Sequence, residues 1–174
     1  MHMSDSREIT ADRETVWAAL LSREVLKECV PGCQEMTGSP EEGFEATVVQ
    51  KVGPVKATFK GGVTLSDIID GESLTLTGEG KGGAAGFAKG GAKVSLADGE
   101  DGKTVLTYDV DAKVGGKLAQ LGSRIIDGFA KKMADQFFTR FQEAVEGPSE
   151  TEGGTDAPEE GGQKKGWFKR VLSR

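Results

Sequence analysis

The sequence is poor in the residues that carry most enzyme chemistry. Its single histidine is His2, at the extreme start of the chain. Without a usable imidazole, catalytic triads and histidine-based proton shuttles are excluded, and a zinc site lacks its usual ligands. The two cysteines lie in Cys29-Val30-Pro31-Gly32-Cys33. A redox pair prefers two intervening residues, so we expect this segment to pack a helix end instead. The sequence therefore predicts a protein that is not an enzyme.

Long apolar runs are also missing. No segment approaches the roughly 20 apolar residues that cross a bilayer, and none resembles a signal peptide. Met1 and His2 look like a cloning remnant before a native start at Met3, so residues 1–3 are set aside. The net charge of −6 and the absence of a basic stripe through residue 163 argue against nucleic-acid binding. We expect one cytoplasmic domain.

Helical and alternating patterns follow one another along the chain. Residues 4–9 predict a weak strand. Thr10 is the expected N-cap of a first helix, and Ser22 that of a second, which Pro31-Gly32 ends. From residue 43 to residue 114, apolar and polar residues alternate in segments separated by Gly-Pro and Asp-Gly turns. These segments predict an antiparallel sheet in meander order.

The strongest periodicity lies at the end of this region. Between residues 117 and 146, apolar residues recur at steps of three and four, from Leu118 to Val145. The apolar face of such a helix must be buried, and the sheet is the only large partner. The predicted fold is α+β: a helix-grip domain over residues 4–146, with a curved antiparallel sheet around a long C-terminal helix and two short N-terminal helices.

Small residues on the predicted sheet favour a cavity beneath that helix. Residues 78–83 contain a G-x-G-x-x-G pattern, but strand patterns flank it on both sides, so sheet bending is favoured over nucleotide binding. The small residues assigned to inward faces are Gly78, Gly80, Ala88, Gly90 and Ala92. Such residues leave volume unfilled, and that volume would be apolar and concave.

The last 28 residues divide into two segments of opposite charge. Residues 147–163 contain acidic residues and no basic ones, which predicts a disordered linker. Residues 164–174 carry five basic residues and no acidic one, with the aromatic pair Trp167 and Phe168. On a helix, the apolar and basic residues of this tail separate into sectors, as in surface-binding helices. The residues predicted to bind a membrane are Lys164, Lys165, Trp167, Phe168, Lys169, Arg170, Val171, Leu172 and Arg174. An acidic protein surface is the competing partner of the tail.

Several motifs together resemble one known family. They are Val16-Trp17-Ala18-Ala19-Leu20, the Cys29–Cys33 element, Gly78-Glu79-Gly80, Gly86-Phe87-Ala88-Lys89-Gly90, and Ile126-Asp127-Gly128-Phe129-Ala130-Lys131-Lys132-Met133-Ala134. Over about residues 5–146, the chain is similar to the CoxG family of carbon monoxide dehydrogenase accessory proteins, within the START/Bet v 1-like (SRPBCC) superfamily. The resemblance implies an accessory protein that helps to recruit a molybdenum hydroxylase to the inner face of the cytoplasmic membrane. It supplies no catalytic residue and no metal site.

The cavity and the resemblance combine into one hypothesis. The partner dehydrogenase must pass electrons to membrane quinones, so the cavity could hold an isoprenoid quinone or another lipid, with no covalent cofactor. From strand parity and helix periodicity, the expected lining residues are Phe59, Leu76, Val94, Leu106, Tyr108, Leu121, Ile125 and Phe129. Tyr108 is the expected polar partner of a quinone carbonyl, whereas Phe137 and Phe141 are expected in the core. Two alternatives remain open: a membrane adaptor with a filled core and no ligand, and an enzyme of the same fold such as a cyclase or hydratase.

Overall fold

The computed structural model describes residues 1–146, which form one antiparallel sheet with helices against one of its faces. The strands of this region are β1 (His2–Ile9), β2 (Cys33–Ser39), β3 (Gly43–Val52), β4 (Val55–Ile69), β5 (Ser73–Lys81), β6 (Phe87–Asp98) and β7 (Thr104–Gly115). The helices are α1 (Arg13–Leu20), α2 (Arg23–Cys29), α3 (Lys117–Gln120) and α4 (Ser123–Glu146), with 3-10 turns η1 (Gly83–Ala85) and η2 (Glu100–Gly102). The predicted α+β helix-grip fold is confirmed.

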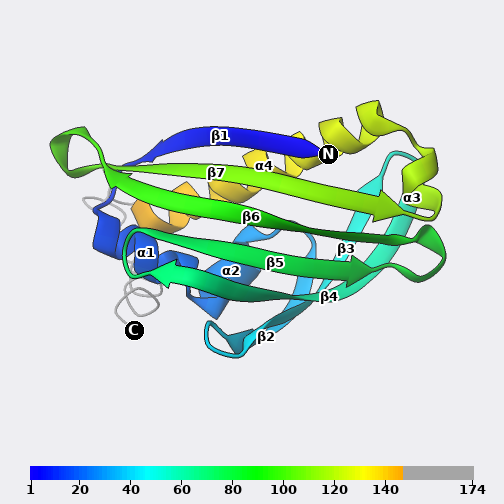
Figure 1. Cartoon of the computed structure of the whole chain (residues 1–174), viewed down its shortest axis with the longest axis horizontal. Coiled ribbons are helices and arrows are strands. Elements are labelled where there is room, and N and C mark those ends of the chain that lie inside the picture. The colour runs from blue at the N-terminus through cyan, green and yellow to red at the C-terminus, as the bar shows by residue number, and fades with distance from the viewer. Residues whose placement is uncertain (147–174) are drawn as a thin grey trace, which may run out of the picture.

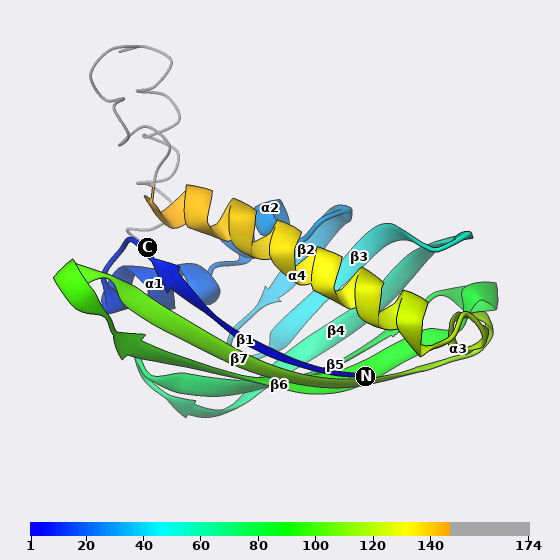
Figure 2. The same ribbon diagram turned by 90° about the horizontal axis from the view of Figure 1, so that it is seen from above.

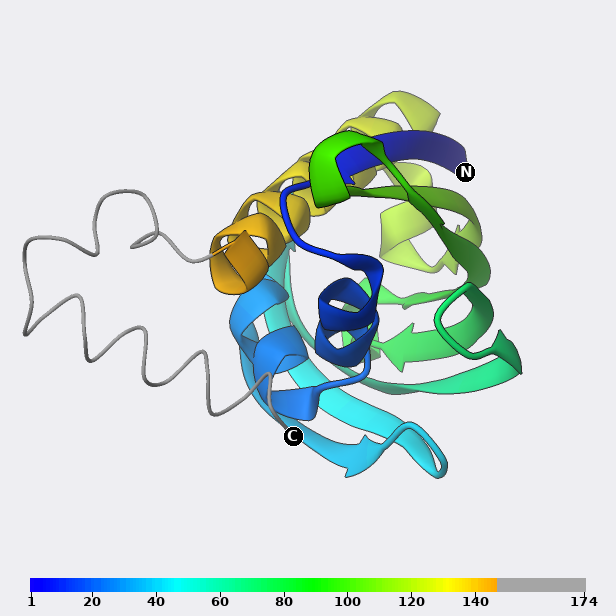
Figure 3. The same cartoon turned by 90° about the vertical axis from the view of Figure 1, so that its left-hand side faces the viewer.

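The sheet runs as a meander from β2 to β7, and β1 closes it beside β7 (Figure 1). Every neighbouring pair of strands is antiparallel. The sheet curls strongly, and α4 crosses its concave side while α1 and α2 cover one end (Figure 2). Seen from that end, the sheet curves around α1, α2 and α4 (Figure 3). This curvature decides how much room is left beneath α4.

Two predicted helix boundaries are wrong. Asp12, not Thr10, caps α1, because its carboxylate accepts a hydrogen bond from the Thr15 backbone N–H. The Thr10 N–H instead donates to the Glu146 carboxylate at the end of α4. The C-terminal helix is also not continuous from residue 117, since Gly122 has a φ of +91° and separates α3 from α4. Ser22 caps α2 as expected, through the Val25 N–H.

The core consists of two separate hydrophobic clusters. The larger one joins α1, α2 and the second half of α4 to the sheet, and includes Trp17, Leu106 and Phe141. The smaller one lies at the other end, where Val52, Leu118 and Ile126 are buried. Because the two clusters hold the two ends of the sheet against the helices, the stretch between them is where the interior can remain open.

One charged residue lies between the sheet edge and α4. Arg7 of β1 pairs with Leu106 and so faces inward, where its guanidinium contacts the Asp135 carboxylate at 2.6 Å and lies 5.1 Å from the centre of the Phe138 ring. This bond is the main reason why the pKa of Asp135 is lowered. Period-two alternation from Ile9 could have revealed the inward direction of Arg7. The contact ties the β1 edge to α4.

Candidate ligand-binding cavity

An apolar cavity of about 430 Å³ lies on the concave face of the sheet. This volume falls within the range of known small-molecule sites. Inward side chains from β2 to β7 and Val30 at the end of α2 supply the lining. The inward-facing lining residues are Val30, Met36, Phe44, Ala46, Val48, Phe59, Gly61, Val63, Leu76, Gly78, Gly80, Ala88, Gly90, Ala92, Val110 and Ala112.

Rows of small residues across the strands create this space. One row places Gly61 beside Gly80 and Gly80 beside Ala88. The next row places Gly78 beside Gly90 and Gly90 beside Ala112. All five small residues that the sequence assigned to inward faces are among the lining residues. Where a usual core would have branched side chains, the middle of this sheet therefore presents mostly bare backbone.

Glycine has two different roles in this surface. At Gly61 a Cβ atom would lie 1.9 Å from the Glu79 carbonyl oxygen, and at Gly90 it would lie 2.1 Å from that of Asp111. The tight curl brings neighbouring strands so close that no side chain fits at these two positions. At Gly80, by contrast, the nearest atom to a Cβ would be the Phe59 Cβ at 3.9 Å. Gly80 thus leaves space that a larger residue could fill.

The apolar residues of α4 are buried to different degrees along the helix. Near its end, Phe138, Phe141 and Val145 are buried in the larger cluster. Met133, in the middle of the helix, is only half-buried, as is Phe129. The helix is therefore packed more firmly near its C-terminal end than in its middle.

The structure distributes the eight predicted lining residues over three places. Phe59 and Leu76 line the cavity. Leu121 and Phe129 pack against the smaller cluster, and Ile125 is 40% exposed above Gly53. The remaining three residues belong to the buried larger cluster: Val94, Leu106 and Tyr108. Parity identified the correct face of each strand, but it could not say how far along the strand the cavity begins.

Tyr108 is therefore not placed where it could meet a ligand in the cavity. Its ring stacks on Phe138 with 5.1 Å between the ring centres, and its hydroxyl interacts with Arg7. Three charged residues border the cavity, namely Glu79, Lys89 and Asp111, but strand alternation directs their exposed side chains outward. The lining side chains that point inward are apolar, so the cavity suits an apolar ligand and offers no acid–base pair.

Residues 1–146 offer no recognisable site for a metal ion or a nucleotide. This region contains no group of three or more His, Cys, Asp or Glu side chains able to hold a metal ion. The G-x-G-x-x-G pattern lies at the end of β5 and leads through the three-residue turn η1 into β6. A dinucleotide site needs a helix after that loop, so the glycines serve the sheet, as the sequence predicted.

The Cys-x-x-x-Cys element connects α2 to the edge of the sheet. Cys29 ends α2 in the larger cluster and Cys33 begins β2, and both thiols are free. Between them, Gly32 has a φ of +80°, and its carbonyl accepts a hydrogen bond from the Val49 N–H at 2.9 Å. The Gln50 side chain donates to the Pro31 carbonyl at 2.8 Å. These hydrogen bonds hold the connection between α2 and β2 against β3, and the connection places Val30 at the cavity.

The two thiols should react at very different rates. Burial raises the pKa of Cys29 to about 12, and this residue is only 1% exposed. Cys33 is half-buried, and its pKa is raised less. Since only the thiolate is a nucleophile, we expect one thiol to react with iodoacetamide in the native protein and both to react in urea. Peptide mapping should locate the native label on Cys33, and a native label on Cys29 would contradict the burial of the Cys29 thiol.

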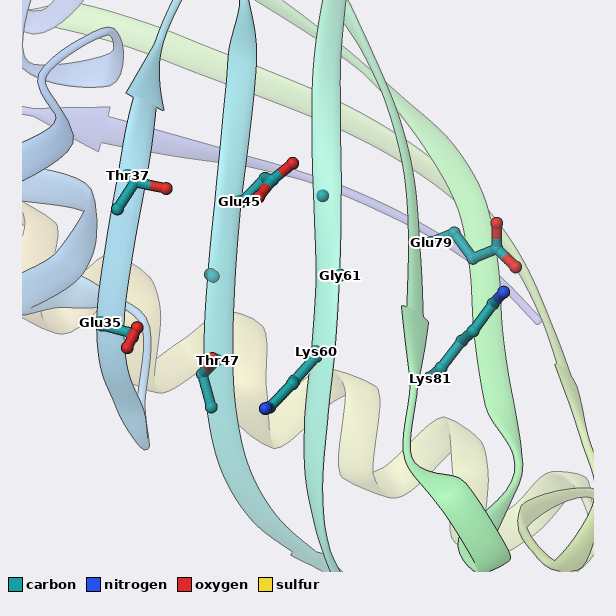
Figure 4. A pocket seen from close by; sticks show the side chains of 10 residues that line it. Glu35, Thr37, Glu45, Thr47, Lys60, Gly61, Glu79 and Lys81 are labelled. Carbon is teal, nitrogen blue, oxygen red and sulfur yellow. The ribbon is translucent and has the colours of Figure 1, made fainter.

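The convex face of the sheet carries a polar hollow. A hollow of about 550 Å³ there is lined by charged and polar residues of β2 to β5, and their side chains point away from α4 (Figure 4). They include Glu35, Glu45, Lys60, Glu79 and Lys81. This hollow is larger than the concave cavity, but its lining is charged and polar, so it does not suit an apolar ligand. Among the described residues, no helix is long and apolar enough to cross a membrane.

The predictions for the linker and the tail lie outside the described residues. They concern the linker 147–163 and the tail 164–174, including all nine residues predicted to bind a membrane: Lys164, Lys165, Trp167, Phe168, Lys169, Arg170, Val171, Leu172 and Arg174. These remain predictions.

Comparison with known proteins agrees with the fold and with one family. The family model that describes the G subunit of carbon monoxide dehydrogenase (CoxG) matches residues 6–146. Among curated proteins, none matches the chain significantly. A solved structure of a conserved protein from Geobacillus kaustophilus is similar with a TM-score of 0.78 and 29% identity, over 83% of this chain and 95% of that one. A START superfamily protein from Mycobacterium smegmatis has a TM-score of 0.63 and 15% identity, over 83% and 97% of the two chains.

Proposed function

Because this chain belongs to the CoxG family, we propose that it is an accessory protein that carries a hydrophobic lipid ligand for a molybdenum hydroxylase of the carbon monoxide dehydrogenase type. The observation that supports ligand binding is the apolar cavity of about 430 Å³ between the two core clusters. A protein that acted only as an adaptor would gain stability by filling this space. Instead, small residues occupy the middle of four neighbouring strands, β4 to β7.

The proposed ligand is a respiratory quinone held by its isoprenoid chain. The inward side chains of the cavity are apolar, which suits a hydrocarbon chain and not a charged or sugar-like molecule. Tyr108 is engaged with Phe138 and Arg7, so the polar head group would bind backbone groups or remain at the cavity opening. A dehydrogenase that reduces quinone in a membrane gives such a carrier its role.

Recruitment to the membrane is the second part of the proposal. The tail 164–174 combines five basic residues with Trp167 and Phe168 and contains no acidic residue. An anionic bilayer attracts each nearby basic residue with about 1 kcal/mol, and the aromatic residues can insert. We propose that the protein acts at the inner face of the cytoplasmic membrane. Catalysis is not part of the proposal, since the family and the fold are generally those of ligand-binding or accessory proteins.

Native mass spectrometry of the full-length protein purified from its own host tests the ligand. The expected result is one quinone per protein chain, identified after organic extraction. A protein that is reproducibly empty, yet still sediments with anionic vesicles through residues 164–174, would favour the ligand-free adaptor. Turnover of a small substrate by the purified protein would favour the third alternative, an enzyme of this fold.

A further inference from the structure

One end of the described domain is made of segments that contain only basic charges. The β3–β4 turn, the β5–β6 connection, α3 and the start of α4 meet at this end, on the right in Figures 1 and 2. Segments 51–60, 81–89 and 113–124 contain eight basic residues and no acidic one. We name this set the basic end: Lys51, Lys56, Lys60, Lys81, Lys89, Lys113, Lys117 and Arg124. The nearest acidic residues along the chain are Glu79, Asp111 and Asp127, just outside the three segments.

The opposite end has the reverse charge. The turns between β2 and β3, β4 and β5, and β6 and β7 are residues 40–42, 70–72 and 99–103. These turns contain six acidic residues and one basic residue, Lys103. The domain is therefore strongly bipolar along the direction of its strands. A bipolar charge distribution orients a protein in front of a charged surface before contact is made.

The pairing of the strands makes the basic end more unusual. Lys51 lies directly opposite Lys56, Lys60 opposite Lys81, and Lys89 opposite Lys113. Like charges directly opposite each other destabilise a sheet. In the middle of the sheet, by contrast, Lys93 faces Asp109. Six lysines in three repulsive pairs are a cost that the fold does not need, which indicates that a binding partner uses them.

These basic groups are exposed and available to a partner. All eight residues of the basic end are exposed, and none forms an ion pair with another residue of the described region. Only Lys89, at the inner border of the set, has an acidic residue directly opposite it on a neighbouring strand, namely Glu79. Lys60 and Lys81 can be seen on the convex face in Figure 4.

Two large apolar side chains stand among these lysines. Phe87 is 37% exposed at the start of β6, and Ile125 is 40% exposed in the first turn of α4. Exposed apolar side chains within a field of basic residues are typical of surfaces that bind anionic membranes. The basic end therefore offers both the charge and the apolar groups that such a surface needs.

From this arrangement we propose that the folded domain binds an anionic phospholipid surface directly through its basic end, with Phe87 and Ile125 entering the interfacial layer. This contact is separate from the tail, to which the proposed function assigned membrane binding. It would direct the acidic end, where Ile68 and Ile69 are also exposed, away from the bilayer. The smaller core cluster, which includes Phe59, would then lie between the membrane and the cavity.

Both membrane contacts can form on one bilayer. The 24 residues of α4 lead from the basic end to Glu146, a distance of about 36 Å along the helix. The 17 residues between 147 and 163 can span at most about 60 Å. The tail can therefore return to the surface on which the domain sits. Two linked contacts raise the effective affinity well above that of either one.

The test uses full-length protein and vesicles of phosphatidylcholine with or without phosphatidylglycerol. The variant Lys56→Glu/Lys81→Glu/Lys113→Glu changes one member of each lysine pair. We expect it to bind phosphatidylglycerol vesicles on the order of 100-fold more weakly, given about 1 kcal/mol per basic residue near such a surface. Each repulsive pair becomes an attractive one, so its melting temperature should not fall. Loss of binding could then not be attributed to unfolding.

Matched controls separate the basic end from overall charge. Lys27→Glu/Lys132→Glu/Arg140→Glu changes the net charge by the same amount at exposed residues elsewhere and should retain most of the binding. Ile125→Asn should weaken binding, whereas Ile69→Asn, at the acidic end, should not. Reversal of Lys164, Lys165 and Lys169 should reduce binding independently of the triple variant.

Two other outcomes would overturn the inference. If the Lys56/Lys81/Lys113 variant binds vesicles as the wild type does and only the tail variant fails, the domain makes no membrane contact of its own while the tail assignment stands. If that variant binds vesicles normally but no longer binds the partner dehydrogenase, the basic end docks on an acidic protein instead. None of these measurements depends on whether the cavity holds a ligand.

Discussion

Full-length protein carrying Gly80→Leu and Ala92→Leu is expected to fold normally and to bind decylubiquinone on the order of 100-fold more weakly than the wild type. Both positions line the cavity from the inward face of the sheet. A Cβ at Gly80 meets no atom closer than 3.9 Å, so the new side chain has room to enter. If the two side chains displace about four methylene groups of the ligand, the loss is about 3 kcal/mol. Isothermal titration calorimetry measures it.

Gly128→Leu is the matched control for this experiment. Gly128 lies on an exposed part of α4, and a Cβ there would have no neighbour within 4 Å. This substitution should leave the affinity unchanged and favour the helix by about 1 kcal/mol. If the filled variant bound the quinone as tightly as the wild type, the ligand site would lie elsewhere. If it unfolded, Gly80→Ala alone would provide a milder test.

Leu106→Ala is expected to lower the free energy of unfolding by about 2–5 kcal/mol. Leu106 is 0% exposed in the larger cluster, between the sheet and the helices, so its loss leaves a void among well-packed neighbours. Urea unfolding monitored by circular dichroism should show a lower midpoint with an unchanged slope. Quinone affinity, measured under conditions where the variant is folded, should change little.

Ile69→Ala provides the comparison for Leu106→Ala. Ile69 is 55% exposed at the end of β4, and its truncation should alter stability by less than about 0.5 kcal/mol. The opposite outcome for Leu106→Ala would change the assignment of Leu106 to the packed core. If Leu106→Ala kept its stability and lost quinone binding, Leu106 would line the ligand site, as strand parity first suggested.

Residues of the same strands form the cavity on one face of the sheet and part of the basic end on the other. Strand alternation sends Gly78, Gly80 and Ala88 inward, while it sends the intervening Glu79, Lys81 and Lys89 outward. One short stretch of sequence therefore shapes the ligand space on one face and contributes charge on the other. Substitutions in this stretch should be assigned to a face before their effects on binding are interpreted.

The sequence alone determined the fold class and the kind of interior. Period-two alternation and a long apolar helix face follow from the need to bury one side of each element, so they identified the meander from residue 43 onward and the covering helix. They did not predict β2 or the pairing of β1 with β7. The small residues Gly78, Gly80, Ala88, Gly90 and Ala92 likewise predicted unfilled space, because a missing side chain leaves volume wherever the strand is placed. The family resemblance is also a property of the sequence, and the match over residues 6–146 confirms it.

Only the tertiary structure decided where along the strands the interior is open and where it is packed. Val94, Leu106 and Tyr108 share their face with the cavity residues, but α1, α2 and the end of α4 cover them, and periodicity carries no information about which helix reaches which row. The break at Gly122, the inward Arg7 and the three opposed lysine pairs depend on chain reversal or strand register in the same way. Contacts between residues far apart in the chain are set by the curl of the sheet, and glycine permits the close approaches that this curl requires, such as that of Gly61 to Glu79.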